Sequence, residues 1–165
     1  MSSYTCGVLT VSDKGSQGER EDTSGALLQQ MLADSGFTVK SYQIVPDKVE
    51  EIRKVLTEWV DALGLDLIVT TGGTGVAPTD VTPEATAAVI EREIPGISEA
   101  MRHASLQKTV RAVLSRGIAG IRKQSLIINL PGSKKAAKEN LEVVLAALPH
   151  AIYKIKGGTE ECGST

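Results

Sequence analysis

The segment from Val69 to Pro83, VTTGGTGVAPTDVTP, constrains the fold of this 165-residue chain more than any other. The apolar run from Leu65 to Val69 that leads into it stops abruptly in a glycine-rich loop. Such a run predicts a buried strand of a parallel sheet, and the glycines permit close ligand approach that a Cβ would obstruct. Thr82, Pro83 and Glu84 follow as a predicted N-cap, first helical residue and first-turn acid. The segment therefore predicts a strand, a ligand-binding loop and a helix.

The glycine-rich loop carries groups that suit phosphate oxygens. Its backbone N–H groups and threonine hydroxyls lie within one short stretch, Thr71, Gly72, Gly73, Thr74 and Gly75. The loop matches neither GxxxxGK[ST] nor GxGxxG, so a tight turn without a ligand remains the alternative. Asp80 would repel a bare anion, and we therefore expect a cation between its carboxylate and the phosphates.

Predicted strands and helices alternate along the chain. Short apolar runs predict strands at 7–12, 37–45 and 65–69, and two runs around a polar turn predict a hairpin within 117–130. Helical spacing predicts helices that end at Gly36 and Gly64, one after Pro83 to about Glu91, one over 98–107, and a last one capped by Ser133. We expect a polar loop at 13–24, a break at Pro95 and Gly96, and the end of the last helix near Pro149.

This alternation predicts the fold class. Strands joined by helices of this length imply parallel βαβ crossovers and a sheet covered on both faces. We predict an α/β fold: a three-layer α/β/α sandwich with a mostly parallel sheet and one antiparallel hairpin strand. At this length we expect a single domain over 1–165, with a frayed tail at 158–165.

Aspartates follow the predicted strands. Asp13, Asp47 and the loop that ends at Asp80 each come after a strand, and the carboxyl ends of parallel strands share one edge of a sheet. We therefore expect these residues to converge, although Asp47 and Asp80 as plain turn residues are the alternative. Two carboxylates beside phosphates suit Mg²⁺, so Asp47 and Asp80 are candidate metal ligands.

Other polar residues have both a functional and a structural interpretation. Ser133, with Lys134 behind a Pro-Gly turn, suits either an anion site at a helix N-terminus or plain capping. Arg122 and Lys123 form an exposed turn or reach a phosphate. His103 and His150 lack Cys or His at ligand spacing, so we interpret both as structural, and no Ser/His/Asp nucleophile set is evident.

Composition and charge exclude several classes of protein. The net charge is −2, yet the stretch from Arg102 to Lys138 holds nine Lys or Arg residues and no acid, which favours attraction of a small polyanion. An aromatic content of 3% offers few stacking platforms, so we expect no nucleic-acid partner. No apolar run approaches a membrane span and the start, MSSYTCG, lacks signal-peptide features, so we expect a cytoplasmic protein. Cys6 and Cys162 predict neither a disulfide nor a zinc site.

Several of these motifs occur together in a known family. TTGGTGVAPTDVTPEAT at 70–86, VSD at 11–13, PD at 46–47 and INLPGSKKA at 128–136 resemble the molybdenum cofactor biosynthesis family. The resemblance extends from about Tyr4 to Gly157, and its closest branch is molybdopterin adenylyltransferase, including the corresponding domain of gephyrin. The acid at Asp80 favours this branch over a sister branch of similar size.

The resemblance implies a function and assigns roles. It implies a three-layer α/β domain, usually trimeric, that uses Mg-ATP to adenylylate the terminal phosphate of molybdopterin and releases pyrophosphate. The essential acids fall on Asp47 and Asp80. Nucleotide contacts fall on Ser12, Asp13, Thr71, Gly72, Gly73, Thr74 and Gly75, and the pterin side falls on Ser133, which we expect to act with Lys134. The molybdate-insertion enzyme is a candidate partner.

Two other functions remain open at this point. A molybdopterin-binding or scaffolding module without turnover would keep the same pocket, and a nucleotide-binding regulatory protein would ignore pterins. The subunit interface of a trimer is also not readable from periodicity. Its candidate apolar residues, for which core packing is the alternative, are Ile97, Ala100, Met101, Val113, Leu114 and Ile118.

Overall fold

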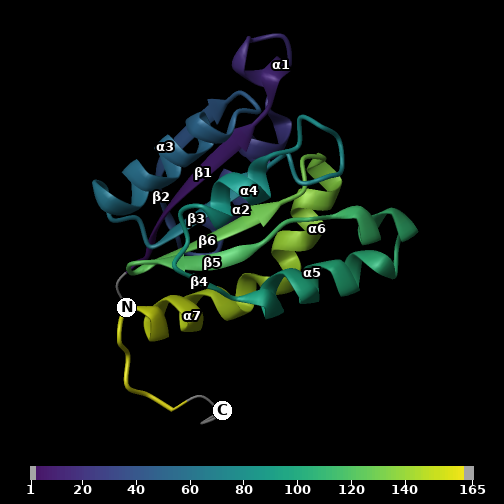
Figure 1. The fold of residues 1–165 in the computed structure, drawn as a ribbon. Coiled ribbons are helices and arrows are strands. Elements are labelled where there is room, and N and C mark those ends of the chain that lie inside the picture. The colour runs from purple at the N-terminus through teal and green to yellow at the C-terminus, as the bar shows by residue number, and fades with distance from the viewer. Residues whose placement is uncertain (1–2, 162–165) are drawn as a thin grey trace.

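A six-stranded sheet forms the centre of the protein. In the computed structural model, which describes residues 3–161, the strands lie in the order β2-β1-β3-β6-β5-β4 (Figure 1). Strands β1, β2, β3 and β6 are parallel, while β5 is antiparallel to both β6 and β4. The prediction of a mostly parallel sheet with an antiparallel hairpin strand is confirmed. The bounds are β1 (Thr5–Val11), β2 (Thr38–Val45), β3 (Leu67–Thr71), β4 (Arg92–Glu93), β5 (Ala119–Arg122) and β6 (Ser125–Leu130).

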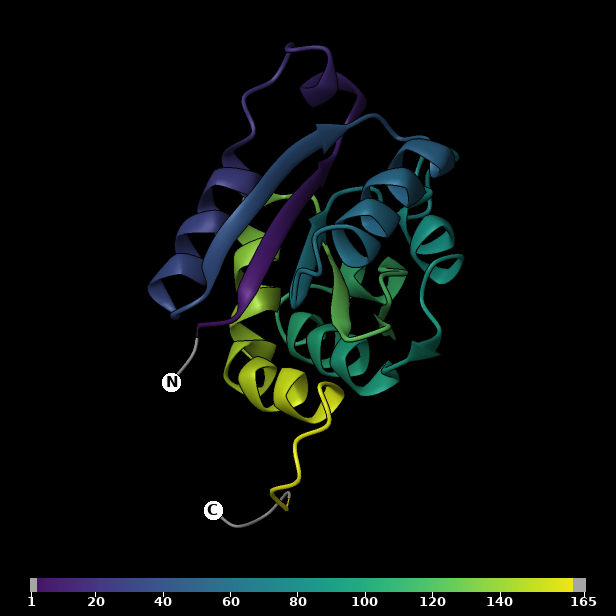
Figure 2. The ribbon, with the colours of Figure 1, turned by 90° about the vertical axis from the view of Figure 1, so that its left-hand side faces the viewer.

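Helices cover both faces of the sheet (Figure 2). One face packs against α2 (Thr23–Asp34), α5 (Pro95–Leu106), α6 (Lys134–Val144) and α7 (Leu148–Ile155). The other face packs against α3 (Val49–Asp61) and α4 (Thr82–Ala87). Three short elements complete the chain: α1 (Asp13–Ser16) and the 3₁₀ helices η1 (Val110–Leu114) and η2 (Leu145–Ala147). The predicted three-layer sandwich is confirmed.

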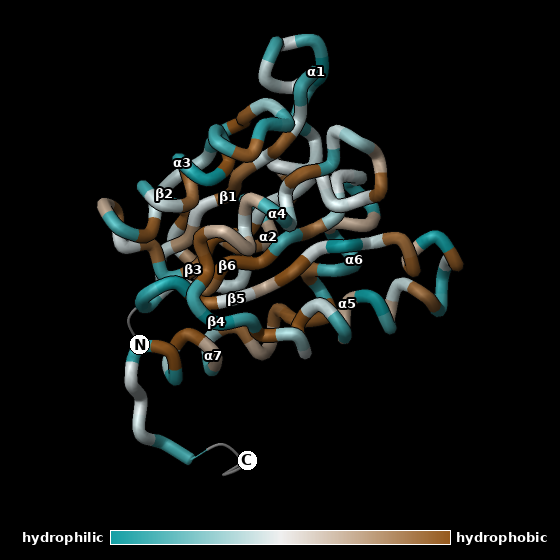
Figure 3. Tube along the Cα trace, in the orientation of Figure 1, coloured by the Kyte–Doolittle hydropathy of each residue, from teal (hydrophilic) through white to brown (hydrophobic). Residues whose placement is uncertain are grey.

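The central strands are hydrophobic on both sides, which explains the two cores. In β1, Cys6 and Val8 contribute to the core under α2 and α6, whereas Leu9 and Val11 contribute to the core under α3. Successive side chains of a strand point to opposite faces, so a strand buried on both sides has a continuous apolar sequence. Figure 3 shows this contrast, with hydrophobic central strands and a hydrophilic segment around α1.

Several helix boundaries differ from the prediction. Helix α4 begins at Thr82 with Val81 as its N-cap, so the predicted Thr82 cap is wrong. The Thr82 hydroxyl instead donates a hydrogen bond to the carbonyl oxygen of Gly72, 2.9 Å away. Helix α4 ends at Ala87 rather than near Glu91, and the chain then forms β4 beside β5.

Prolines begin two helices where the sequence suggested a break or an end. Pro95 is the first residue of α5, so the expected break at Pro95 and Gly96 is wrong, because a proline fits the first helical turn. Pro149 likewise lies in the first turn of α7. The predicted loop at 13–24 contains α1 and the start of α2. Residues 162–165 of the predicted frayed tail, with Cys162, lie outside the described residues.

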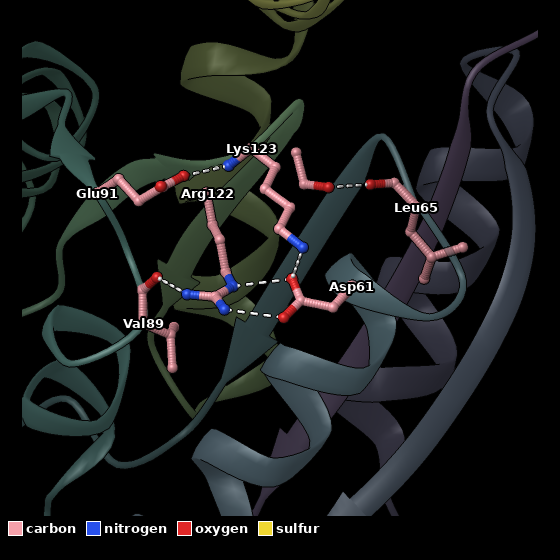
Figure 4. A network of polar contacts seen from close by, with 7 residues as sticks. Asp61, Leu65, Val89, Glu91, Arg122 and Lys123 are labelled. Atoms are coloured by element: carbon pink, nitrogen blue, oxygen red, sulfur yellow. Dashed lines mark hydrogen bonds and ion pairs between the residues drawn. The ribbon is translucent and has the colours of Figure 1, made fainter.

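Arg122 and Lys123 lie at the edge of the sheet where the parallel strands begin (Figure 4). Arg122 forms a bidentate pair with Asp61, to which its Nε and Nη2 donate at 3.0 and 2.8 Å. Its Nη1 donates to the carbonyl of Val89. The Arg122 hydrogen bond is the main reason that the pKa of Asp61 falls to about 2. These cations therefore tie α3 to the hairpin, and the alternative that they reach a phosphate in the loop cleft is wrong.

No helix within residues 3–161 is both long enough and apolar enough to cross a membrane.

Candidate active site

A polar cleft of about 520 Å³ lies at the carboxyl ends of the parallel strands. Helices α2 and α3, which leave β1 and β2, pack on opposite faces of the sheet, so the cleft lies at a switch point of the topology. The predicted convergence of the strand ends is confirmed. Its lining residues are Thr10, Val11, Ser12, Arg20, Glu21, Asp22, Thr23, Ser24, Asp47, Thr71, Gly72, Gly73, Asp80, Gly132, Ser133 and Lys134.

The glycine-rich loop follows β3 in a conformation that requires glycine. Gly72 and Gly73 have φ angles of 102° and 69°. A Cβ on Gly72 would lie 2.3 Å from the carbonyl oxygen of Val11, and one on Gly73 would lie 2.3 Å from the Thr82 hydroxyl oxygen. Gly72 donates its N–H to Leu130 at 3.2 Å. Glycine is thus needed because the loop presses against β1 and α4.

The next three backbone N–H groups, unlike that of Gly72, take no part in holding the loop. The N–H groups of Gly73, Thr74 and Gly75 donate to no acceptor in the described part of the chain. Their carbonyl groups are engaged, since Gly73 accepts from Thr82, and Thr74 and Gly75 accept from Arg116. The loop is therefore held through its acceptors, and its donors stay available for an anion.

Asp13 and Asp47 hold each other in place across the cleft edge. The N–H of Asp13 donates to Oδ2 of Asp47 at 3.0 Å, and the N–H of Asp47 donates to Oδ1 of Asp13 at 2.8 Å. Burial raises the pKa of Asp47 above its ordinary value, and the charges of Asp13 and Asp80 raise it further, against the lowering effect of the Asp13 backbone bond. Asp47 is therefore a carboxylate held in an electronegative setting.

Asp80 lies at the far end of the glycine-rich loop. Its Oδ2 accepts from the N–H of Ala77 at 3.0 Å, and its own N–H donates to the carbonyl of Ala77 at 2.9 Å. Gly75 makes room for this carboxylate, because a Cβ there would lie 2.8 Å from Oδ2 of Asp80. A Cβ on Gly73 would likewise lie 3.3 Å from Oδ1 of Asp47. Both carboxylates thus rest against glycines of the same loop.

The carboxylates fit a magnesium ion only together with a substrate. Residues 3–161 contain no group of three or more His, Cys, Asp or Glu side chains placed to hold a metal. Mg²⁺ beside nucleotides is commonly held by one or two carboxylates plus substrate phosphates, a pattern that Asp47 and Asp80 fit. Burial is the main reason that the pKa of Asp47 is raised, and the charges of Asp13 and Asp80 add to it; a cation would relieve this added repulsion.

Three helix N-termini line the cleft. Ser133 caps α6, with its Oγ accepting from the N–H of Ala136 at 3.2 Å, and Lys134 is the first helical residue. Helix α2 begins beside it, and the Ser24 hydroxyl donates to the carbonyl of Gly132 at 2.8 Å. Ser12, which also lines the cleft, caps α1 by accepting from the N–H of Gly15 at 3.0 Å. Helix N-termini favour anions, so this end of the cleft suits a phosphate.

Asp22 lines the cleft, although no sequence motif pointed to it. One oxygen of Asp22 accepts from the hydroxyls of Thr10 and Tyr42, and the other accepts from the N–H of Gly25. The local sequence Asp-Thr-Ser-Gly has the pattern of a helix N-cap, which is the signal that could have located it. Arg20, also in the lining, has no such signal because its position depends on the path of the loop after α1.

A second cavity of about 270 Å³ borders the same loop. Thr74 and Gly75 of the loop line this cavity, whereas Thr71, Gly72 and Gly73 line the polar cleft. The predicted site residues are therefore divided between the polar cleft and this cavity, except Asp13, which lines neither. The second one is lined further by Arg102, Ser105, Lys108, Thr109, Arg111, Ala112, Leu114, Ser115, Pro131, Ala136, Glu139 and Asn140.

Known proteins are similar to this chain in sequence and in fold. The chain is 45% identical to molybdopterin adenylyltransferase of Helicobacter pylori strain J99, over 95% of this chain and 90% of that protein. It is 50% identical to gephyrin of Dictyostelium discoideum and 46% identical to the molybdenum cofactor synthesis protein cinnamon of Drosophila melanogaster. The chain covers 90% and 94% of its own length in those two matches but spans only 22% and 26% of theirs.

A solved structure agrees with the sequence matches. The molybdopterin biosynthesis enzyme MoaB of Thermus thermophilus superposes with a TM-score of 0.89 at 52% identity, covering 96% of this chain and 99% of that one. The model of one family, described as a probable molybdopterin binding domain, matches residues 7–150. The cleft, the glycine-rich loop and these matches together show that the chain belongs to the molybdopterin-binding domain family of molybdenum cofactor biosynthesis.

Proposed function

We propose that this chain is a molybdopterin adenylyltransferase, which transfers AMP from Mg-ATP to the terminal phosphate of molybdopterin and releases pyrophosphate. The observation that carries the proposal is the loop: the N–H groups of Gly73, Thr74 and Gly75 have no acceptor within residues 3–161, and Gly73 and Gly75 lie against Asp47 and Asp80. The Helicobacter pylori relative, matched over 90% of its length, has the name of this activity.

The reaction needs no nucleophile from the protein. An oxygen of the pterin's terminal phosphate attacks the α-phosphorus of ATP, and a new P–O bond forms. The bond from the α-phosphorus to the oxygen that bridges to the β-phosphorus breaks, and pyrophosphate leaves with its electron pair. Such a transfer depends on positioning and on neutralisation of charge. The cleft lining, within the described residues, accordingly includes no Cys or His side chain.

The nucleotide side of the site is assigned to the β1 and β3 strand ends. Ser12 and Thr71 line the cleft and would border the nucleotide, with Asp13 bonded to Asp47 at its edge. Gly72 would act through its lack of a side chain, since its N–H is already engaged. The N–H groups of Gly73, Thr74 and Gly75 donate to phosphate oxygens on which charge develops. This assignment uses all the loop residues that the sequence suggested.

Asp47 and Asp80 would hold the magnesium ion. When bound, Mg²⁺ would neutralise charge on the ATP phosphates. Asp47 follows β2 and Asp80 ends the loop itself, and both rest against glycines of that loop, so together they would orient the phosphates relative to its N–H groups. Their catalytic role is therefore orientation of ATP through its phosphates.

The pterin side is assigned to the start of α6. Ser133 and Lys134 would receive the terminal phosphate of molybdopterin, because a helix N-terminus and an ammonium group both favour an anion. The second cavity, on the other side of Thr74 and Gly75, offers space for the pterin ring system. A molybdopterin spanning the two hollows would bring its phosphate to the nucleotide.

The oligomeric state of the protein and its location in the cell stay predictions. Of the candidate interface residues, Met101 is buried in the core between α5 and the sheet, as the alternative of core packing predicted. Val113 and Leu114 remain candidates, with 64% and 50% of their surfaces exposed. A homotrimer is testable by light scattering at micromolar concentration. A cytoplasmic location and delivery of product to the molybdate-insertion enzyme await their own tests.

The proposal is tested by reconstitution. Purified protein is mixed with molybdopterin, ATP and Mg²⁺, and pyrophosphate release is followed while each component is omitted in turn. We expect release only when all three are present. Molybdopterin binding without pyrophosphate release would instead support the binding-module alternative, and ATP binding without pterin binding would support a regulatory protein.

A further inference from the structure

We propose that Arg116 is a positioning residue that fixes Asp80 and the end of the glycine-rich loop for catalysis. This inference rests on the proposed function for its kinetic consequence and on the structure alone for its geometry. Arg116 lies between η1 and β5, far along the chain from the loop it contacts.

The guanidinium group of Arg116 uses all three of its nitrogens. Its Nε donates to the carbonyl of Gly75 at 2.6 Å, and its Nη2 donates to the carbonyl of Asp80 at 2.8 Å. Its Nη1 donates to Oε1 of Glu84, in the first turn of α4, at 2.6 Å. The backbone N–H of Arg116 adds a bond to the carbonyl of Thr74 at 2.8 Å. One residue thus binds both ends of the segment from Gly75 to Asp80.

That segment has little other support. Residues 76–79 are exposed, and Val76 has 64% of its surface exposed. Within residues 3–161, the polar bonds that shape the turn, apart from those of Arg116, are the two between Ala77 and Asp80. An exposed loop held by few bonds opens readily, so the bonds from Arg116 largely determine where the Asp80 carboxylate lies.

Arg116 is itself anchored to the body of the protein. Nη1 of Arg102, on α5, donates to the carbonyls of Ser115 and Gly117, the residues on either side of Arg116. The position of Asp80 is therefore linked through Arg116 to a core-facing helix. The planar guanidinium reaches the two carbonyls and the carboxylate from three different nitrogens, whereas a lysine ammonium would have to make all three bonds from one nitrogen.

The experiment compares Arg116→Lys and Arg116→Ala with two controls. Arg122→Lys removes a similar fork, which joins Asp61 and the Val89 carbonyl at the opposite edge of the sheet. Glu84→Gln removes the charged partner of Arg116 but leaves both loop carbonyl bonds possible. Amide exchange of Ala77, measured by NMR without ligands, reports the loop, and steady-state kinetics report kcat and KM.

In both Arg116 variants the hydrogen of the Ala77 N–H should exchange with solvent about tenfold faster, because its bond to Asp80 loosens. They should lower kcat by about 10²-fold, the usual cost of a displacement of about 1 Å, while KM for molybdopterin changes less than about threefold. Arg122→Lys and Glu84→Gln should leave Ala77 exchange and kcat near their wild-type values.

Two results would overturn the inference: unchanged Ala77 exchange in both Arg116 variants, or a wild-type kcat in Arg116→Lys. A wild-type protein that makes no adenylylated pterin, while Ala77 exchange still accelerates in the variants, would refute the proposed function and support the positioning geometry.

Discussion

Replacing Gly72 with alanine tests the claim that the loop must press against β1. The added Cβ would lie 2.3 Å from the carbonyl oxygen of Val11, and φ at this position is 102°. Ordinary Cβ contacts begin at about 3.4 Å and essentially none is shorter than 3.0 Å, so the loop must move by about 1 Å. A displacement of that size next to the reacting atoms lowers turnover by about 10²-fold.

Gly36→Ala is the matched control, because the alanine would have a similar positive φ angle without a steric clash of its Cβ. Gly36 has a φ of 93°, and nothing lies within 4 Å of the Cβ it would acquire. Both variants lose about 1–2 kcal/mol to the left-handed backbone conformation. Gly72→Ala loses about 2 kcal/mol more to overpacking, which for a protein of this size lowers Tm by a further 4–8 °C or so.

The assay pairs thermal unfolding with adenylylation kinetics. We expect Gly36→Ala to lower Tm modestly at unchanged kcat, and Gly72→Ala to lower both. If Gly72→Ala kept the wild-type kcat and lost no more stability than Gly36→Ala, close packing of the loop against Val11 would not matter for function.

Three further predictions follow from the charged residues. Asp47→Asn should abolish turnover yet raise Tm at pH 7, because a carboxylate with a raised pKa destabilises the fold when ionised; the gain in Tm should shrink as acid protonates Asp47 in the wild type. Asp13→Asn keeps the backbone bond to Asp47 but removes a charge that raises its pKa, so the acidic limb of the kcat/KM profile should move to lower pH. Asp61→Asn should destabilise the protein at pH 7, and the difference from wild type, followed by urea unfolding, should vanish as pH falls from 3.8 to about 2; a difference that persists there would contradict the role of the Arg122 pair.

The sequence predicted the parts of the site that depend on strand order. Asp47 and Gly72 could be located because each follows an apolar run, and parallel strands bring their carboxyl ends to one edge. The predicted Thr82 cap was wrong because capping rules are local, while the carbonyl of Gly72 competes for the same hydroxyl. Strand β4 was missed because two exposed charged residues have no strand signal without their partner β5.

The basic stretch from Arg102 to Lys138 makes contacts within the protein that its composition did not suggest, and its attraction of a small polyanion stays a prediction. We expected an electrostatic field for a small polyanion. Six of its nine cations bond to groups within the protein, and their positions could be known only from packing. Those six are Arg102, Lys108, Arg116, Arg122, Lys123 and Lys138. Lys134, at the start of α6, is the cation of the stretch that lines the polar cleft.

Isotope transfer tests the central claim most directly. The wild-type protein is incubated with molybdopterin, Mg²⁺ and ATP labelled either at the α-phosphate or at the γ-phosphate. The account predicts that the α-label appears in a pterin product heavier by one AMP unit and that the γ-label appears in pyrophosphate. Recovery of an unmodified pterin, with the γ-label released as inorganic phosphate, would contradict it.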